Sequence, residues 1–480
     1  MADSGCHNQL MAARSAGKTA LVLASGGLTG VAYEVGALRG LDRILTNRTV
    51  NDFDIYVGTS AGAVVAASLA SGMPPMVLAG LVAGTVPGFR RLSRMALYRP
   101  NVGEALNRLK GAPELFRRAA GDYWRFRGRV PLSETILTLA PLLPSGIFTN
   151  EGIVDYITET FRTAGLSDDF RDIPKELHIM AADIETDKRV DFSRATTPHI
   201  PVSRAVAAST ANPIIFRPVE IEGRHYVDGG VKGQAAIDIA ISRGATLIVI
   251  VNGLVPLDTA AIARRATVSE ARQSIFDLGI RAIANQVIRG MLHDSLIDHL
   301  KAVREKHPEV NFLLIEPSPD DEKMFFHEVM SFSAQMIVLQ HGYETVINGL
   351  HKTWPYLSRI LPRHGIEITR KVVENKPLEV PVDEMERRGN MVARLFQTVL
   401  DRRTTEGARA DTSARVRPRA PAEAGTEPSK PAQKGTVKAA AKKPAAGKPP
   451  ARKAAAAGGA PGAGKGRQRG NFRPRIVDPD

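Results

Sequence analysis

The feature that most constrains the fold is a pair of short apolar runs that each end at a glycine turn and are joined by one helical pattern. The first run is Thr19–Ala24, and the second run, Phe53–Val57, ends at Gly58. Between them, apolar residues at helical spacing predict a helix from about Gly30 to Thr46. Short continuous apolar runs are typical of strands buried on both faces of a parallel sheet. We therefore expect a βαβ unit with parallel strands and a right-handed crossover.

The later apolar runs continue this alternation of strands and helices. Further strands are predicted at Leu177–Ala182, Pro218–Ile221, His225–Val227, Thr246–Val251 and Asn311–Ile315. Helical patterns lie between and after these runs, the last at roughly Lys323–Leu350. The fold class is therefore α/β, and we expect a doubly wound, mainly parallel sheet with a helical cap and a C-terminal helical extension.

Composition changes abruptly at Arg403. Residues 403–480 contain 18 Lys and Arg against 6 Asp and Glu, so most of the net charge of +14 lies there, and only five residues of the segment are large and apolar. Such a segment cannot bury enough surface to offset its chain entropy, so we expect a disordered basic tail. It would act either as a solubilising linker or as a charged arm, whose partner would be anionic lipid headgroups or, without sequence specificity, nucleic acid.

The sequence does not predict a secreted or membrane-spanning protein. The first twenty residues lack the apolar stretch of a signal peptide. The uncharged segment Ile55–Phe89 is interrupted by Pro74-Pro75 and six glycines, which favours a buried strand and packed helices over a bilayer helix. The single cysteine, Cys6, excludes an intramolecular disulfide and a cysteine-cluster metal site. We expect a cytoplasmic protein that contacts membranes at their periphery.

The motif Gly58-Thr59-Ser60-Ala61-Gly62 follows the second apolar run directly and precedes a run of small residues. A serine at such a strand–turn–helix junction has the arrangement of a nucleophile elbow. Gly58 and Gly62 suit the tight turn, where a side chain would strike the neighbouring strand. The start of the helix also favours a developing negative charge. An ordinary helix N-cap is the simpler alternative, but the context favours Ser60 as a nucleophile.

A second glycine-rich turn, Ser25-Gly26-Gly27-Leu28-Thr29-Gly30, ends the first strand. Its backbone amides at a helix start can bind an anion, and neighbouring parallel strands bring it beside Ser60. Gly26 and Gly27 are therefore candidates for the oxyanion hole that acyl transfer requires. The turn lacks the G-x-G-x-x-G spacing of a dinucleotide site. Gly17-Lys18-Thr19 precedes the strand instead of following it as in a phosphate-binding P-loop.

A third candidate, Asp228-Gly229-Gly230, follows the predicted strand at His225–Val227. Asp-Gly on its own is commonly only a turn. As a general base, Asp228 would have to reach the Ser60 hydroxyl directly. Its carboxylate would then need partial burial to bring its proton affinity closer to neutral pH.

The glycine turn, the G-x-S-x-G motif and Asp-Gly-Gly, in this order, resemble the patatin-like phospholipase family. Two linking stretches are similar to the same family: Ala182–Asp187, and Ala205–Pro213 with Phe216-Arg217-Pro218 after it. The resemblance covers about residues 19–235. It implies hydrolysis of lipid esters by a Ser–Asp dyad without histidine, with an oxyanion hole from the glycine turn. We expect no metal and no cofactor. Carried over, the dyad is Ser60 and Asp228, and the oxyanion hole is centred on Gly26 and Gly27.

This sequence departs from the family pattern in the glycine turn. That turn usually reads G-G-G-x-R/K-G, whereas here Ser25 replaces the first glycine and Thr29 replaces the cation. Ser25 keeps its backbone amide, so the oxyanion hole can survive. The lost cation removes an electrostatic aid to anion or headgroup binding. A catalytically weak or inactive relative that binds lipid or nucleic acid through its basic tail is therefore the alternative function.

A conventional Ser-Asp-His α/β-hydrolase is a second alternative. His293, His299, His327 and His341 all follow Asp228, as that chain order requires. However, all four lie in helical patterns, and no histidine follows a predicted strand in a short loop. None of the histidine spacings resembles a metal site either. Only one predicted strand precedes the region of Ser60, which is too few for the conventional fold.

These observations divide the chain into an N-terminal extension (1–18), a patatin-like catalytic domain (19–235), a C-terminal α/β extension of the catalytic body (236–402) and the basic tail (403–480). A helical insertion spans about residues 74–165. Basic and aromatic residues interleave in it at Phe89–Leu92, Phe116–Arg118 and Tyr123–Arg127. We expect its aromatic side chains to fill the core of a cap that shapes the acyl pocket, and its arginines to meet an anionic membrane surface.

Overall fold

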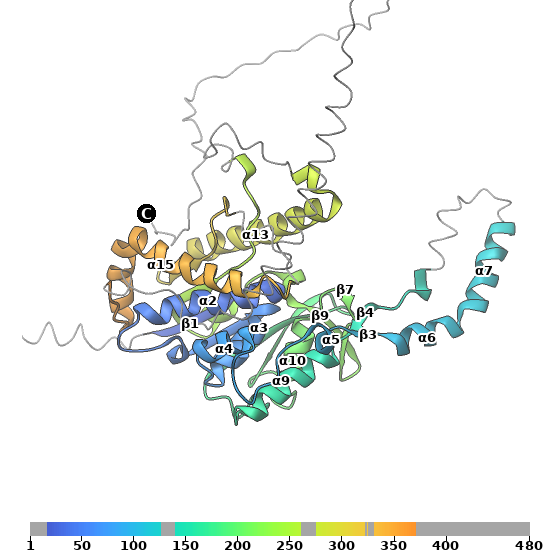
Figure 1. The fold of residues 1–480 in the computed structure, drawn as a ribbon, viewed down its shortest axis with the longest axis horizontal. Coiled ribbons are helices and arrows are strands. Elements are labelled where there is room, and N and C mark those ends of the chain that lie inside the picture. The colour runs from blue at the N-terminus through green and yellow to red at the C-terminus, as the bar shows by residue number, and fades with distance from the viewer. Residues whose placement is uncertain (1–16, 126–139, 261–274, 322–323, 325–330, 371–480) are drawn as a thin grey trace, which may run out of the picture. The chain divides into compact units, whose positions relative to one another are not determined.

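The computed structural model describes residues 17–125, 140–260, 275–321, 324 and 331–370 of the 480-residue chain (Figure 1). The predicted basic tail lies outside these residues, and so does nearly all of the N-terminal extension. The described residues contain the three motifs that the sequence singles out.

Five parallel strands form the centre of an eight-stranded sheet: β1 (Lys18–Leu23), β2 (Ile55–Thr59), β5 (Glu176–Asp183), β10 (Ala245–Val251) and β11 (Asn311–Ile315). Their order across the sheet is β11-β10-β1-β2-β5, and each neighbouring pair is parallel. The helix α2 (Gly27–Ile44) joins β1 to β2. The predicted α/β class with a mainly parallel sheet is therefore confirmed.

Antiparallel strands complete the sheet beside β5. One edge of β5 pairs with β6 (Lys188–Ser193), and the other pairs with a hairpin of β8 (Val219–Ile221) and β9 (Arg224–Asp228). β9 shares this second edge with β2, because β2 pairs with residues 176–180 of β5 and β9 with residues 181–183. The two strands therefore run toward each other along β5, and their ends meet.

A smaller sheet contains three short strands, β3 (Arg99–Pro100), β4 (Gly146–Thr149) and β7 (Ile214–Phe216). None of these strands was predicted from the sequence, and neither was β6. Two of them, β3 and β4, lie in the segment that we expected to be a helical insertion, so that expectation was wrong in part. Strands of two to four residues carry too few side chains to show a period.

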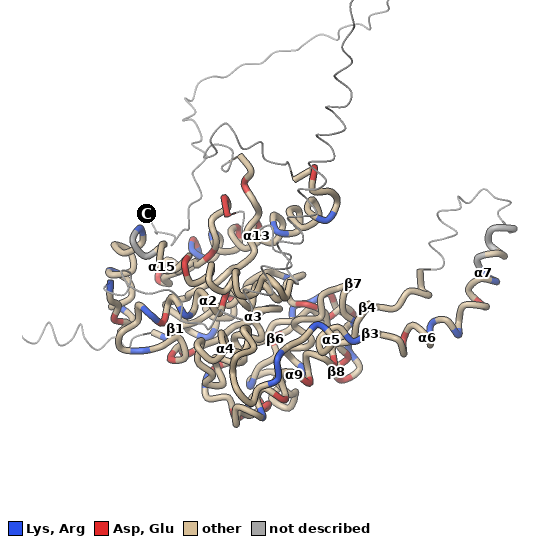
Figure 2. Tube along the Cα trace, viewed as in Figure 1, with Lys and Arg blue, Asp and Glu red and all other residues tan. Residues whose placement is uncertain are grey.

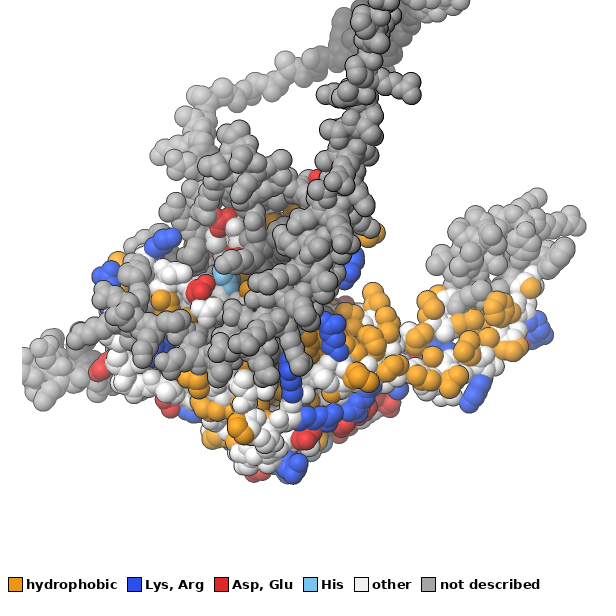
Figure 3. All heavy atoms as spheres, in the orientation of Figure 1, with side chains coloured by type: hydrophobic (Ala, Val, Ile, Leu, Met, Phe, Trp, Pro, Cys, Tyr) orange, Lys and Arg blue, Asp and Glu red, His pale blue; other side chains and the backbone are white. Residues whose placement is uncertain are grey.

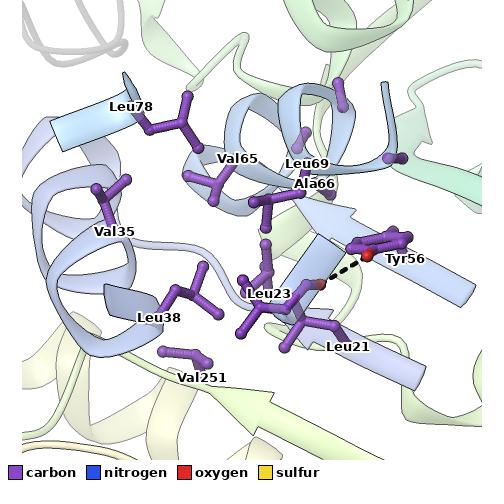
Figure 4. Packing of buried hydrophobic residues seen from close by; sticks show 14 of the residues in the cluster. Leu21, Leu23, Val35, Leu38, Tyr56, Val65, Ala66, Leu69, Leu78 and Val251 are labelled. Carbon is purple, nitrogen blue, oxygen red and sulfur yellow. Dashed lines mark hydrogen bonds between the residues drawn. The ribbon is translucent and has the colours of Figure 1, made fainter. Parts of the chain in front are cut away.

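Helices cover both faces of the large sheet. Leu21 and Leu23 of β1 face one layer, which includes α2, α3 (Ala61–Ala70) and α15 (Gln335–Ile360). The alternate residues Ala20 and Val22 face the other layer, which includes α11 (Ile237–Ser242) and α13 (Ile280–Lys306). Figure 4 shows the first of these cores, where side chains of α2 and α3 meet those of β1 and where the Tyr56 hydroxyl donates a hydrogen bond of 2.7 Å to the Val50 carbonyl. The arrangement is doubly wound, as predicted.

The remaining helices are α4 (Pro75–Ala83), α5 (Arg94–Leu97), α6 (Val102–Lys110), α7 (Ala112–Arg125), α9 (Glu151–Thr163) and α10 (Val202–Ser209). Short 3-10 turns lie at Val50–Asp52, Ala140–Leu142, Gly229–Lys232, Ile275–Leu278 and Leu361–His364. Within the described ranges, no helix combines the length and the apolarity needed to cross a bilayer.

Two predicted helix boundaries were wrong. The first helix begins at Gly27 instead of Gly30, because the glycine turn itself supplies its first residues. The last helix spans Gln335–Ile360 instead of Lys323–Leu350, with Pro355 inside it. Helix continues past this proline because Tyr356, Leu357 and Ile360 are buried, and burial of an apolar face outweighs one lost hydrogen bond.

Candidate functional site

Polar side chains follow four neighbouring strands of the sheet at the point where each strand ends. Ser25 lies just beyond β1, Ser60 follows β2, Asn252 follows β10 and Glu316 follows β11. Because these strands are parallel, their carboxyl ends meet at one edge of the sheet, where open α/β sheets bind ligands. All four residues are buried.

Ser60 lies on a sharp turn between β2 and α3. Its backbone has φ 55° and ψ −119°, a strained conformation for a residue with a side chain. The two predicted elbow glycines make this turn possible. A Cβ on Gly58 would lie 2.5 Å from the Gly62 carbonyl oxygen, and a Cβ on Gly62 would lie 2.3 Å from the Leu23 carbonyl oxygen. Both positions therefore require glycine, and the strand–turn–helix geometry agrees with the sequence prediction.

Asp228 ends β9 opposite Ala181, while Thr59, the residue before Ser60, lies opposite Met180. Since Met180 and Ala181 are consecutive, the ends of β2 and β9 meet beside β5. The Ser60 hydroxyl donates a hydrogen bond to the Asp228 carboxylate, with 2.5 Å between Oγ and Oδ2. The sequence placed these residues 168 positions apart, and the two strand registers bring them into contact.

Burial raises the pKa of Asp228 to about 6, since the carboxylate loses contact with water. Two hydrogen bonds act in the opposite direction and lower it, one from the Ser60 hydroxyl and one of 2.8 Å from the Gly230 amide to Oδ1. At neutral pH the group is mostly ionised but close to its titration range, which is the condition that a general base requires.

Ser209, at the end of α10, holds the backbone of the elbow. Its hydroxyl accepts a hydrogen bond of 2.8 Å from the Ser60 amide and donates one of 2.6 Å to the Met180 carbonyl. Ser209 belongs to the stretch Ala205–Pro213 that is similar to the family, but no role for it was predicted from the sequence. The Ser60 amide is therefore already paired within the protein.

The two oxyanion-hole candidates lie at the start of α2, beside the elbow. Gly27 has φ 59°, which favours glycine, and it lines the cavity that contains Ser60. Gly26 packs against the helix, where a Cβ would lie 2.6 Å from the Cα of Gly30, and it is not among the residues that line the cavity. Neither amide donates a hydrogen bond within the described part of the chain.

A cavity of about 270 Å³ opens onto Ser60 and Asp228. Its wall is mostly apolar, with Leu28, Val31, Val64, Leu97, Ile153, Ile215, Phe216, Leu254, Ile288 and Leu292. The polar part includes Ser25, Asn150, Thr210, Asn212, Asn285 and the buried Arg289. Such a cavity suits a hydrocarbon chain with a polar group fixed at one end. Among the described residues that line it there is no histidine.

A buried network of polar side chains links the glycine turn to α13. The Gln234 carbonyl accepts a hydrogen bond of 3.2 Å from the Ser25 amide, and the Gln234 side-chain amide donates one of 2.6 Å to Asn252. Asn252 in turn donates to Glu316 at 3.1 Å, and Glu316 lies 3.1 Å from His293. This network was not predicted from the sequence. A polar residue directly after each of the apolar runs 246–251 and 311–315 is the signal that could have found it.

Of the four histidines considered for a triad, His293 and His299 lie in α13 and His341 lies in α15, in agreement with the helical patterns. His293 contacts Glu316, and His341 contacts Asp321 and Glu344. His327 lies outside the described residues. Within the described ranges there is no group of three or more His, Cys, Asp and Glu side chains that could hold a metal ion.

The aromatic residues of the insertion do not share one environment. Phe89 is half-buried against the core, as predicted, but Phe116 is 54% exposed, so the prediction that it fills a core was wrong. The side chains of the Tyr123–Arg127 cluster lie outside the described part of the structure. Arg117 and Arg118 are exposed, and both form ion pairs with Glu114.

Comparison with known proteins adds sequence relationships to this geometry. Residues 21–241 match the family model of patatin-like phospholipases. The protein named "Probable lipid hydrolase 463L" of Invertebrate iridescent virus 6 is 32% identical over 102 residues, which is 20% of this chain and 35% of the viral protein. The chain therefore spans about a third of the length of this curated relative.

Two solved structures were also matched at low identity. VipD of Legionella pneumophila is 15% identical, with a TM-score of 0.31 over 70% of this chain and 67% of VipD. The type III effector ExoU of Pseudomonas aeruginosa is 17% identical, with a TM-score of 0.30 over 70% of this chain and 53% of ExoU.

Proposed function

Because residues 21–241 form a patatin-like phospholipase domain, we propose that this protein hydrolyses carboxylic esters of lipids with Ser60 as nucleophile and Asp228 as general base. The observation that carries the proposal is the 2.5 Å hydrogen bond between the Ser60 hydroxyl and the buried Asp228 carboxylate. A serine is a weak nucleophile unless a neighbouring base removes its proton as it attacks. The Asp228 carboxylate accepts the hydrogen bond that the Ser60 hydroxyl donates.

The proposed reaction has two stages. In the first, Asp228 takes the hydroxyl proton while Ser60 Oγ attacks the ester carbonyl. The tetrahedral intermediate then collapses, and the departing alcohol takes the proton from Asp228. In the second stage, Asp228 takes a proton from water, the resulting hydroxide attacks the acyl-enzyme, and the fatty acid leaves as Ser60 recovers its proton. The protons balance over the two stages.

Charge on the intermediate would be stabilised by the backbone at the glycine turn. Gly27 lines the cavity and its amide lies at the N-terminal end of α2, where the helix dipole favours an anion. Gly26 is the N-cap of the same helix and is proposed as the second donor. The Ser60 amide is a poorer candidate than either, because it donates to Ser209.

A fluorophosphonate probe tests the proposal, since it reacts covalently with an activated serine. The wild-type protein should be labelled at Ser60 and should release fatty acid from a phospholipid, and Ser60→Ala should lose both activities. Ser68→Ala is a matched control, because Ser68 lies in α3, the helix that follows Ser60, and its hydroxyl donates to the Val64 carbonyl. Labelling of Ser60→Ala at another residue would refute the assignment.

The same experiment separates the alternatives. A wild-type protein that resists the probe and hydrolyses no lipid would be a non-catalytic lipid- or nucleic-acid-binding relative that works through its basic tail. A protein whose activity depends on a histidine would be a conventional triad hydrolase. The described residues that line the cavity include Asp228 beside Ser60 but no histidine, which favours the dyad over the triad.

We further propose a peripheral contact with anionic membrane, made by the basic tail and by arginines of the insertion. Arg90, Arg117 and Arg118 are exposed and partly neutralised by acidic neighbours. The tail, with its 18 basic and 6 acidic residues, would contribute the larger share of the attraction. The proposal places the protein in the cytoplasm, at the periphery of a membrane. The proposed reaction uses neither a metal nor an organic cofactor.

A further inference from the structure

The helix α6 has an apolar face that no described part of the chain covers. Val102, Leu106 and Leu109 lie at positions i, i+4 and i+7 and therefore share one face. Each of them is 55–57% exposed, and no residue of α6 is buried. Figure 3 shows hydrophobic side chains gathered over α6 and over the region of β4 and β7. A helix with such a face normally buries it against a partner.

The other face of α6 is fixed by polar contacts. Glu104 accepts hydrogen bonds from Arg108, from the Ser145 amide and from the Asn101 side chain. Arg108 also donates to the Pro141 carbonyl at 2.8 Å. These contacts orient α6, so the apolar face is turned away from its polar partners.

The two ends of the segment that contains α6 lie at the cavity. The chain enters through Leu97 and returns through Asn150 and Ile153, and all three line the cavity of Ser60. Asn101 joins these ends, because its amide donates to the Ile147 carbonyl at 3.0 Å and its side chain donates to the Gly146 carbonyl at 3.1 Å. The base of α6 is therefore anchored beside the wall of the cavity.

Further apolar side chains are exposed where this segment meets the cavity wall. Met95 precedes the lining residue Leu97 and is 89% exposed, and Ile214 precedes the lining residue Ile215 and is 79% exposed. Ile147 of β4, the strand that pairs with β7, is also more than half exposed. Large apolar side chains at this level of exposure mark an interaction site when they gather in one region.

The charge of the same segment indicates the partner. Residues 90–125 contain nine Lys and Arg but only three Asp and Glu, a net charge of +6. Figure 2 shows Lys and Arg in blue along the chain that enters α5 and along the described parts of α6 and α7. An amphipathic helix with leucines on one face and basic residues around it suits the interface of an anionic bilayer. Burial of the leucines and attraction of the basic residues to anionic lipid both contribute to binding there.

We propose that α6, together with Met95, Ile147 and Ile214, inserts its apolar side chains into the surface of an anionic bilayer and thereby holds the cavity against the lipid. This proposal rests on the proposed function, since a lipid ester has to leave the bilayer and enter the cavity to reach Ser60. The surface differs from the basic tail and the arginines, because it acts by burying apolar area.

The test compares Leu106→Asp with Asn107→Asp in the full-length protein. Both variants add one negative charge at neighbouring exposed positions of α6, but only Leu106 lies on the apolar face. Binding is measured by sedimentation with phosphatidylcholine vesicles that contain phosphatidylserine, at low salt and at high salt, where the attraction of the tail is screened. Hydrolysis is measured on vesicle lipid and on a soluble short-chain ester.

Leu106→Asp should weaken vesicle binding by about tenfold or more, because a leucine buried in hydrocarbon contributes at least that factor. The loss should persist at high salt, and the rate on vesicle lipid should fall relative to the rate on the soluble ester. Asn107→Asp should behave like wild type. The double variant Leu106→Asp/Leu109→Asp should weaken vesicle binding further.

Equal vesicle binding by wild type and Leu106→Asp would overturn the proposal. A dimer that light scattering detects in the absence of lipid, and that Leu106→Asp dissociates, would also overturn it. The apolar face of α6 would then bind a second copy of the chain. If wild type fails to hydrolyse the soluble ester but Leu106→Asp still loses vesicle binding, the docking surface stands and the proposed hydrolase function fails.

Discussion

The hydroxyl of Ser209 accepts a hydrogen bond from the backbone amide of Ser60, with 2.8 Å between the two atoms. The same hydroxyl donates to the Met180 carbonyl of β5 at 2.6 Å. A strained residue needs support from its surroundings if it is to keep its conformation. Ser209 supplies that support by linking the elbow to β5, and Asp228 also lies beside β5, opposite Ala181.

Ser209→Ala should therefore lower kcat with little change in KM. It would leave the Ser60 amide and the Met180 carbonyl buried without this partner, at a cost of about 1–3 kcal/mol, and it would loosen the orientation of Ser60. Steady-state kinetics on a soluble ester and chemical denaturation check both effects. Ser71→Ala is the control, because Ser71 is also buried but donates only to the Ala67 carbonyl. An unchanged kcat would show that the elbow does not depend on Ser209.

Asp228→Asn should abolish most of the activity and at the same time stabilise the fold at neutral pH. Loss of a general base costs about 10²–10⁴-fold in rate. The folded-state pKa of about 6 lies above the ordinary aspartate value, so folding favours the protonated form. The stability that this shift contributes is present at acidic pH and is lost as the pH rises through about 6.

At pH 7 the free energy of unfolding of Asp228→Asn should therefore exceed that of the wild type by up to about 3 kcal/mol. This difference should shrink toward pH 4. Denaturation curves of both proteins at the two pH values measure the difference. A variant that is equally destabilised at both values would indicate a structural role for the carboxylate instead of a buried charge.

The dependence of kcat/KM on pH should have its acidic limb near pH 6. The base must be ionised to accept the proton of Ser60, and the pKa of Asp228 is about 6. At pH 5, kcat/KM should be about a tenth of its plateau value. A soluble ester without titratable groups is the substrate for this measurement. A limb near pH 4 would show that the carboxylate is solvated in the active protein.

Truncation after Arg402 should weaken binding to anionic vesicles and leave hydrolysis of a soluble ester unchanged. The removed residues carry a net charge of +12, from 18 basic and 6 acidic side chains. Their attraction to anionic lipid should fall steeply with added salt. Sedimentation at low and high salt measures the effect, and DNA competition tests whether the tail prefers nucleic acid. Equal binding by the intact and truncated chains would remove this role from the tail.

The central strands could be predicted from the sequence because burial on both faces leaves a direct mark. Every residue of β2 is buried, and the strand has no polar side chain before Thr59 except the Tyr56 hydroxyl, which donates to the Val50 carbonyl. The elbow glycines could be predicted for a similar reason, since the lack of a side chain at Gly58 and Gly62 is itself the structural requirement.

The contact between Ser60 and Asp228 could not be derived from local pattern. It depends on β9 and β2 sharing one edge of β5, and pairings between distant segments leave no periodic signal in either strand. This contact was predicted only from the resemblance to the patatin-like family, which rests on the order of the three motifs. The apolar face of α6 was missed because its three residues are spread through a short helix with charged neighbours.

Gly62→Ala should be far more damaging than Gly103→Ala, although both replace a glycine inside a helix. The new Cβ at position 62 would lie 2.3 Å from the Leu23 carbonyl oxygen, whereas nothing lies within 4 Å of the one at position 103. Neither the Leu23 backbone nor α3 can move without displacing Ser60, so Gly62→Ala should cost about 3 kcal/mol or more and most of the activity. Gly103→Ala should instead stabilise the protein by about 0.5–1 kcal/mol, because alanine restricts the unfolded chain. Denaturant midpoints and ester hydrolysis of the two variants give the comparison, and similar costs at both positions would contradict the close approach of α3 to β1.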